Sequence, residues 1–259
     1  MTMPPSSPWL ACRLRRPAAS VRLFCFPHSG GSVGEYVRWA DLLPDVEVWG
    51  VQLPGRGSRA EEPPFTRLPE LVATLVDAVD FGTSFAFFGH SLGALVAFET
   101  ARRLRDLGRV PPGWLFVSAA PAPQLPPRGI PASHLDEDGL LTALEPIYGE
   151  LAQELREDAE LRELILPGLR ADLSLVESYP YEARAPLDCE LVVTGGTRDD
   201  LTREELEPWR AHSTGPFALH LLPGGHFYLR EQKDALLRLL SDRLRQGRPH
   251  TVSSKDLKP

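Results

Sequence analysis

The sequence of 259 residues lacks the long apolar runs and dense basic blocks that would connect it to a membrane or to nucleic acid. No run approaches the roughly 18 apolar residues of a membrane span. The first residues, MTMPPSSPWLACRLRRP, contain no continuous apolar core of the kind that a signal peptide needs. The formal net charge is -7, without a block rich in Lys or Arg. We therefore expect a cytoplasmic protein that binds neither membrane nor nucleic acid.

Cysteine is scarce, and the common nucleotide-binding motifs are missing. Cys12, Cys25 and Cys189 are odd in number and widely spaced, so we expect buried free thiols rather than disulfides or a zinc site. The chain has no G-x-x-x-x-G-K-[ST] loop, and no G-x-G-x-x-G follows a strand-like run. We expect the protein to bind no cofactor of its own.

The residues that are present describe an ordinary globular protein, with 42% apolar and 24% charged residues. Short apolar runs alternate with helical patterns, which favours a mostly parallel central sheet with helices on both faces. The strands are expected at 21–26, 47–51, 84–88, 114–118, 190–194 and 218–222. The main helices are expected at 36–43, 68–79, 94–107 and 231–245.

Between Pro121 and Pro186 the strands vanish and helical periodicity dominates, after the proline-rich stretch APAPQLPPRGIP. We interpret this region as a helical insertion that forms a lid over an active site; the alternative is that its helices merely cover the sheet. The predicted division is an N-terminal extension (1–19), a core (20–126 and 181–245), the helical insertion (127–180) and a disordered tail (246–259).

The segment FAFFGHSLGALVAFETARRL, residues 85–104, contains a motif that carries chemistry. A buried strand runs through G-x-S-x-G into an amphipathic helix, and this context is typical of a nucleophile elbow. In such a turn a strained backbone exposes the serine hydroxyl, and glycines are required where strand and helix pass closely. We predict that Ser91 is a nucleophile.

A serine nucleophile needs a general base and an acid that orients the base. In ALHLLPGGHFYL, His226 follows the last predicted strand, where catalytic loops gather in open α/β sheets. In CELVVTGGTRDDL, Asp199 and Asp200 both follow the preceding strand. We prefer Asp199 as the acid, because Gly-x-x-Asp is the usual turn for this role, and expect Asp200 to cap the next helix.

The tetrahedral oxyanion must be held by two backbone N–H groups. One belongs to the residue after the nucleophile, which is Leu92, and the other to a loop after an early strand. FCFPHSGGS is such a strand and loop, and Ser29 is our candidate for the second donor. Gly30 and Gly31 could instead cradle a phosphate, but the lysine of a phosphate-binding loop is missing.

Six stretches together resemble the type II thioesterases that accompany polyketide and nonribosomal peptide synthetases, within the α/β-hydrolase superfamily. They are FCFPHSGG, VQLPGRGSRAEEPPF, FFGHSLGALVAFETAR, LLPGLRADLSLVESY, PLDCELVVTGGTRDD and LPGGHFYL, and the similarity covers roughly residues 20–245. The resemblance implies an α/β-hydrolase fold and hydrolysis of stalled or wrong acyl groups from the phosphopantetheine arm of acyl or peptidyl carrier proteins.

The same resemblance implies a role for each candidate residue. The catalytic triad would be Ser91, Asp199 and His226, with Ser29 and Leu92 as oxyanion donors. Residues 127–180 would form a lid that shapes the acyl pocket. Ser29 stands where the family more often has alanine, a difference that leaves a backbone donor unchanged.

Two other functions stay open at this point. The triad chemistry also fits a serine carboxylesterase or lipase that acts on free small esters, and a noncatalytic binding module on a hydrolase fold is a remote alternative. If carrier proteins are the partners, their acidic surfaces require a local basic patch on this acidic chain. Arg56, Arg59 and Arg128 are the candidates.

Overall fold

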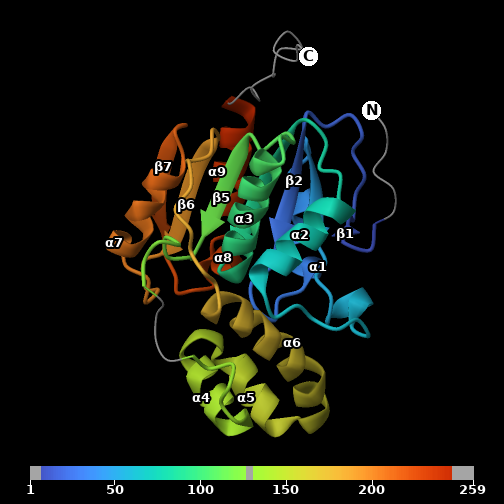
Figure 1. Cartoon of the computed structure of the whole chain (residues 1–259), viewed down its shortest axis with the longest axis vertical. Coiled ribbons are helices and arrows are strands. Elements are labelled where there is room, and N and C mark those ends of the chain that lie inside the picture. The colour runs from blue at the N-terminus through green and yellow to red at the C-terminus, as the bar shows by residue number, and fades with distance from the viewer. Residues whose placement is uncertain (1–6, 127–130, 247–259) are drawn as a thin grey trace.

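The computed structural model describes residues 7–126 and 131–246, which build one central sheet with helices around it (Figure 1). The sheet has seven strands in the order β1-β3-β2-β4-β5-β6-β7. Every neighbouring pair is parallel except β1 with β3. The strands are β1 (Leu10–Ala11), β2 (Val21–Phe26), β3 (Val46–Val51), β4 (Phe85–His90), β5 (Trp114–Ser118), β6 (Glu190–Gly196) and β7 (Phe217–Leu222).

Helices cover both faces of this sheet. The α-helices are α1 (Val33–Val37), α2 (Leu68–Ala78), α3 (Leu92–Asp106), α4 (Glu137–Tyr148), α5 (Glu150–Glu157), α6 (Ala159–Glu177), α7 (Arg203–Leu206), α8 (Tyr228–Glu231) and α9 (Lys233–Gln246). Three 3-10 helices are η1 (Arg38–Asp41), η2 (Gly57–Arg59) and η3 (Glu207–His212). No helix within the described ranges is both long enough and apolar enough to cross a membrane.

The core lies in two layers because successive side chains of a strand point to opposite faces. In β2, Phe24 and Phe26 pack into the layer that also holds the apolar residues of α2 and α3. Leu23 and Cys25 pack into the layer that holds those of α1, η1 and α9. Strands buried on both faces are the expected state of a parallel sheet.

The predicted fold class is confirmed, with three local corrections. The helix expected at 36–43 is instead the short α1 followed by the 3-10 turn η1. The C-terminal helix expected at 231–245 is α9, and the short helix α8 precedes it. Leu10–Ala11, inside the expected N-terminal extension, pairs with β3 and forms the edge of the sheet as a two-residue strand that is too short for its pattern to predict.

The cysteines are free thiols. Cys25 and Cys189 are buried, and burial raises the pKa of the Cys189 thiol to about 12. Cys12 is only partly buried, contrary to expectation, because it lies in the segment between β1 and β2 rather than inside a strand.

The helices α4, α5 and α6 occupy the described part of the helical insertion and have their own apolar core. They lie together beyond one end of the sheet, the end toward which the parallel strands run (Figure 1). Residues 127–130 of the predicted insertion lie outside the described residues, as does the predicted tail apart from residue 246 at the end of α9.

Candidate active site

Ser91 lies in a strained turn between β4 and α3. Its φ of 54° and ψ of -121° place a residue with a side chain in the left-handed half of conformational space, which is costly outside glycine. The backbone N–H of Ser91 donates to the Ser118 carbonyl at the end of β5, with N and O 2.8 Å apart. The turn therefore has the geometry expected of a nucleophile elbow.

Two glycines permit this turn because the chain passes itself too closely for a side chain. A Cβ on Gly89 would lie 2.2 Å from the carbonyl oxygen of Gly93, and a Cβ on Gly93 would lie 2.0 Å from that of Phe26. The second contact also shows that the start of α3 abuts the end of β2. The elbow and the loop after β2 are therefore neighbours.

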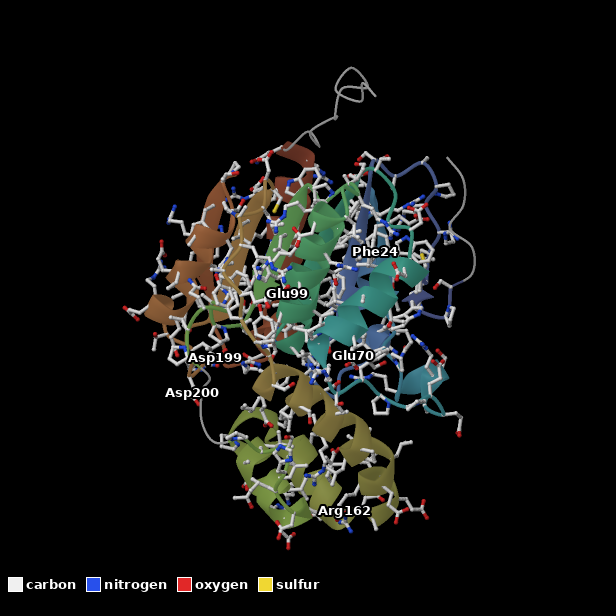
Figure 2. All side chains as sticks on the ribbon, viewed as in Figure 1. Phe24, Glu70, Glu99, Arg162, Asp199 and Asp200 are labelled. Atoms are coloured by element: carbon white, nitrogen blue, oxygen red, sulfur yellow. The ribbon has the colours of Figure 1, made fainter. Side chains whose placement is uncertain are left out.

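His226 and Asp199 meet across two adjacent loops at the same end of the sheet. His226 Nδ1 lies 3.0 Å from Asp199 Oδ2, and both side chains are largely buried, with 16% and 6% exposed. The Nδ1–H donates to the carboxylate, which leaves Nε2 as the basic nitrogen. Figure 2 shows Asp199 at the lower end of the sheet, on the side that faces α4.

Backbone contacts between the loops after β6 and β7 hold this pair together. The N–H of Thr197 donates to Leu222, and that of Arg198 donates to Gly224, both at 2.8 Å. A Cβ on Gly196 would lie 2.2 Å from the Gly225 carbonyl oxygen, so glycine is needed where the loops approach. The adjacency of β6 and β7 is what brings the predicted acid and base into contact.

The structure distinguishes the two neighbouring aspartates. Asp199 makes the contact with His226, whereas Asp200 is exposed. The expectation that Asp200 caps the next helix is wrong. The N-cap of helix α7 is Thr202, two residues later, which forms a capping box with Glu205, a pairing in which each side chain satisfies a backbone N–H of the other residue.

The two predicted oxyanion donors lie on the neighbouring segments described above. Leu92 is the first residue of α3, so its N–H has no acceptor within the helix. Ser29 is buried in the loop after β2, whose tight turn is closed by a hydrogen bond from the Gly31 N–H to the His28 carbonyl at 2.8 Å. The close approach of Gly93 to the end of β2 brings the two segments together.

Two further histidines, His28 and His90, surround this site and are buried. Burial, together with nearby Arg230 and His226, lowers the pKa of His28 to about 3. Burial also places the pKa of His90 well below its usual value, helped by His226 and His28. The ring centroid of His90 lies 5.1 Å from that of His226. Both flanking imidazoles are therefore neutral near pH 7.

A chain of hydroxyl groups holds the side chain of His90, the residue of the elbow before Ser91. Its Nδ1 lies 2.8 Å from Ser118 Oγ, which lies 2.7 Å from the Tyr228 hydroxyl. The Tyr228 hydroxyl donates to Thr194 Oγ1 at 2.6 Å. Because this chain joins β4, β5, β6 and α8, it couples the position of the residue before Ser91 to the sheet itself.

The predicted docking arginines are not free surface groups where the structure describes them. Arg56 pairs through both terminal nitrogens with Asp172, which is 1% exposed. Arg59 is buried, lies 4.1 Å above the Trp9 ring centre and pairs with Glu62. Arg128 lies outside the described residues. Arg56 and Arg59 therefore hold loops in place, and their assignment to a docking patch is wrong.

The sequence analysis missed three residues of the insertion that contact the predicted oxyanion loop, residues 27–31 after β2. Asp172 and Tyr148 form hydrogen bonds with Gly30 and Ser29, and Leu169 packs against Gly30. The signal in the sequence was a charge on an apolar face: Asp172 continues the spacing of Leu169 and lies beside Leu173, where a solvated aspartate would not be expected.

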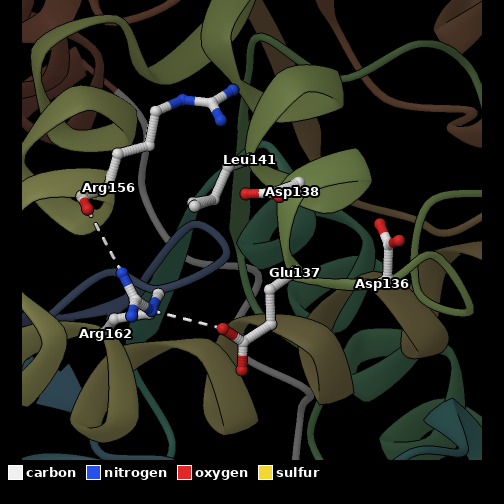
Figure 3. Close-up of a pocket in the computed structure, with 6 residues that line it drawn as sticks. All are labelled: Asp136, Glu137, Asp138, Leu141, Arg156 and Arg162. Carbon is white, nitrogen blue, oxygen red and sulfur yellow. Dashed lines mark hydrogen bonds and ion pairs between the residues drawn. The ribbon is translucent and has the colours of Figure 1, made fainter.

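The structure also has a hollow inside the insertion, with a volume of about 440 Å³ (Figure 3). Its lining comes from α4, its N-cap, α5 and α6: Asp136, Glu137, Asp138, Leu141, Arg156 and Arg162. Glu137 and Arg162 form an ion pair across it. None of the predicted site residues contributes to this hollow, which is therefore distinct from the candidate active site.

The elbow, the loops after β6 and β7 and the mostly parallel sheet define an α/β-hydrolase. Residues 21–244 match the model of the thioesterase domain family. The chain is 40% identical over 233 residues to the thioesterase PikA5 of Streptomyces venezuelae, covering 88% of this chain and 82% of that protein. The chain therefore belongs to the thioesterase family and is a hydrolase that acts on thioesters.

Two further similarities agree with this family. The type II thioesterase BorB from the borrelidin biosynthetic cluster superimposes with a TM-score of 0.79 at 35% identity, covering 92% of this chain and 96% of that chain. The protein named linear gramicidin dehydrogenase LgrE, from Brevibacillus parabrevis, is 38% identical over 244 residues, covering 92% of this chain and 93% of its own. Although LgrE is named a dehydrogenase, the matched family model and BorB are thioesterases.

Proposed function

We propose that this chain removes stalled or incorrect acyl groups from the phosphopantetheine arm of carrier proteins in polyketide or nonribosomal peptide biosynthesis, in the cytoplasm. The observation that carries the proposal is the contact of 3.0 Å between His226 and Asp199, formed at the same sheet end as the strained Ser91. The relationship to PikA5 and BorB supports the choice of substrate.

In the first half of this mechanism Ser91 Oγ attacks the thioester carbonyl while His226 Nε2 accepts the hydroxyl proton. Asp199 holds the imidazole through Nδ1 and stabilises the imidazolium. The backbone N–H groups of Leu92 and Ser29 receive the negative charge that develops on the carbonyl oxygen. The carbon–sulfur bond then breaks, the pantetheine sulfur takes the proton from His226, and an acyl-serine remains.

In the second half water replaces the thiol. His226 removes a proton from the water, the hydroxide adds to the acyl-serine carbonyl, and the same N–H groups hold the second tetrahedral oxyanion. The Ser91 oxygen leaves with the proton from His226, and the free carboxylic acid is released. Neither half requires a metal or a cofactor held by the protein. The phosphopantetheine belongs to the substrate.

The first experiment asks whether Ser91 is the nucleophile. A fluorophosphonate probe should label the wild-type chain and leave Ser91→Ala unlabelled, and hydrolysis of an acyl-carrier protein should fall by several orders of magnitude, roughly 10³-fold or more, in that variant. Equal labelling of the two proteins, or a loss of only about twofold, would contradict a serine mechanism.

The second experiment separates carrier editing from general ester hydrolysis. One acyl group is presented on a carrier protein, on coenzyme A, on pantetheine and as a nitrophenyl ester. Remote contacts raise kcat/KM only when the transition state uses them, so we expect the highest kcat/KM on the carrier protein. Equal kcat/KM on all four substrates would make the chain a general acyl hydrolase.

A further inference from the structure

One peptide group of the oxyanion loop is bonded at both of its ends by the helical insertion. The Ser29 carbonyl accepts a hydrogen bond from the Tyr148 hydroxyl at 3.0 Å. The Gly30 N–H, which belongs to the same peptide unit, donates to Asp172 Oδ2 at 2.8 Å. Tyr148 ends α4 and Asp172 lies in α6, so two separate helices fix the orientation of this peptide plane.

The peptide group next to it carries the proposed oxyanion donor. Peptide units are planar, so fixing the Ser29–Gly30 plane leaves only rotations at Ser29 itself to direct the Ser29 N–H. Gly30 adopts a φ of +70°, and a Cβ there would lie 3.3 Å from Leu169 Cδ1, one turn before Asp172. The loop is therefore pressed against α6 as well as hydrogen-bonded to it.

The guanidinium of Arg56, in the loop after β3, holds the Asp172 carboxylate in place. This carboxylate is 1% exposed and binds both terminal nitrogens of Arg56, with Arg56 Nη1 2.7 Å from Oδ2. A buried carboxylate without a partner would be strongly unfavourable, and a buried ion pair contributes little net stability compared with apolar packing. What the pair does provide is a fixed position for Oδ2, the atom that binds the Gly30 N–H.

Tyr148 also lies close to the loop that bears His226, the proposed catalytic base. Its ring centroid lies 5.5 Å from that of Phe227, the residue after His226. Burial raises the pKa of Tyr148 far above its usual value, so the phenol keeps the proton that it donates to Ser29. One side chain of α4 therefore touches both the oxyanion loop and the loop that bears His226.

We propose that Asp172, assisted by Tyr148, is a positioning residue that sets the direction of the Ser29 N–H for the tetrahedral oxyanion. Neither residue is assigned a contact with substrate. The inference rests on the proposed function, because it requires Ser29 to be an oxyanion donor. It also makes the insertion part of the catalytic geometry rather than only a cover for the acyl chain.

The test compares Asp172→Ala with wild type in hydrolysis of an acyl-pantetheine. We expect kcat to fall roughly 10- to 100-fold, less than the loss of roughly 10²- to 10³-fold that follows removal of a donor itself, with KM changed by less than about threefold. In Asp172→Asn the amide oxygen can still accept the Gly30 N–H, so its loss should be smaller. Tyr148→Phe should lose about three- to tenfold in kcat.

A second readout reports the oxyanion directly. An alkyl trifluoromethyl ketone adds reversibly to a serine hydroxyl and forms a tetrahedral hemiketal whose oxygen occupies the oxyanion position. Its inhibition constant should rise by the same factor by which kcat/KM falls in each variant. The affinity of a non-hydrolysable thioether analogue of acyl-pantetheine, which forms no oxyanion, should stay within about threefold of wild type.

Glu177→Gln is the matched control. Glu177 is another carboxylate of α6 that accepts backbone N–H groups, from Ala132 at 2.7 Å and Ser133 at 3.1 Å, but it does not touch the oxyanion loop. If Asp172 acts only by stabilising the insertion, the Asp172 substitutions and Glu177→Gln will lower the thermal midpoint alike and change kcat alike. That result, or an unchanged ketone inhibition constant in Asp172→Asn and Tyr148→Phe, would overturn the proposal even if Asp172→Ala fails to fold.

The outcomes separate this inference from the proposed function. Absence of fluorophosphonate labelling at Ser91 in wild type would contradict the serine mechanism and, with it, the role of Asp172. Labelled and active wild type with Asp172 variants that behave like Glu177→Gln would contradict only the role of Asp172. A selective loss of ketone binding in the Asp172 and Tyr148 variants is the result expected here.

Discussion

The elbow at residues 89–93 and the oxyanion loop at 27–31 lie next to each other, but they are held by different parts of the molecule. The elbow is fixed by close backbone approaches and by a hydrogen bond to Ser118, all within β2, β4, β5 and α3. The Ser29–Gly30 peptide of the oxyanion loop is bonded by side chains of α4 and α6. One half of the site is therefore built by the core, and the other half depends on the insertion.

This difference suggests how the site divides its tasks. The contacts that fix the turn at Ser91 come from β2, β5 and α3, which all belong to the core. A loop held by Asp172 and Tyr148 has the right geometry only while α4 and α6 contact it. If Ser29 is an oxyanion donor, as proposed, changes in the insertion will alter the rate of the chemical step while Ser91 stays in place.

The largest expected effect comes from a substitution in the elbow, the half of the site that the core holds. In Gly93→Ala the new Cβ would lie 2.0 Å from the Phe26 carbonyl oxygen, a backbone atom that cannot yield without separating α3 from β2. We expect the free energy of unfolding to fall by more than about 4 kcal/mol, or no folded protein to accumulate. Urea unfolding monitored by circular dichroism measures the change.

Gly108→Ala is the control for this substitution. Gly108 has a positive φ of 66°, which Gly93 in α3 does not, but a Cβ on Gly108 meets nothing within 4 Å. Only the backbone penalty of about 1–2 kcal/mol should apply. If the two variants were equally stable, the close approach at Gly93 would not be what requires glycine in the elbow.

The next largest effect concerns the acid of the proposed triad. Asp199→Asn keeps the shape but loses the charge and favours the wrong tautomer of His226, so we expect kcat to fall by about 10³-fold or more, with KM little changed. Asp200→Asn, one residue away and exposed, should stay within about tenfold of wild type. Greater damage in Asp200→Asn would move the acid by one residue.

The contrast between the elbow, fixed by the core, and the oxyanion loop, held by the insertion, also explains what could be predicted from the sequence. The elbow, Asp199 and His226 follow from local patterns, because each comes directly after a strand and parallel strands end at a common sheet edge. The family resemblance then indicated the thioesterase activity. Asp172 and Tyr148 could not be placed, because they lie 142 and 119 residues from the partners that define their roles. The sequence also gives no sign that Arg56 is paired, because its partner Asp172 belongs to the distant insertion.

A third prediction concerns acid stability and compares the histidine of each half, His28 in the oxyanion loop and His90 in the elbow. Burial lowers the pKa of both below the value of about 6.5 in the unfolded chain, to about 3 for His28. The unfolded state thus binds more protons below pH 6.5. Their stabilising effect is complete above that pH and is lost as the pH falls toward 3. We expect the pair to lower the free energy of unfolding by about 3–4 kcal/mol between pH 7 and pH 5.

Comparing variants isolates the histidine contribution from that of the carboxylates. The difference in unfolding free energy between pH 7 and pH 5, measured with urea, should shrink by about 2 kcal/mol in His28→Gln. His134→Gln, at an exposed position, should leave that difference unchanged. An identical pH dependence in wild type and His28→Gln would mean that His28 is protonated, or accessible to water, in the native state.

The smallest expected effect separates the interior of the insertion from its contact with the oxyanion loop. Glu137 and Arg162 form an ion pair at the hollow of Figure 3, with the carboxylate side chain 66% exposed. Exposed pairs contribute at most about 1 kcal/mol, so Glu137→Gln should lower the thermal midpoint by no more than about 2 °C. Because this pair does not touch Ser29 or Gly30, kcat should remain within about twofold of wild type. A tenfold loss of kcat in Glu137→Gln would show that the position of the oxyanion loop depends on the whole helical insertion rather than on Asp172 and Tyr148.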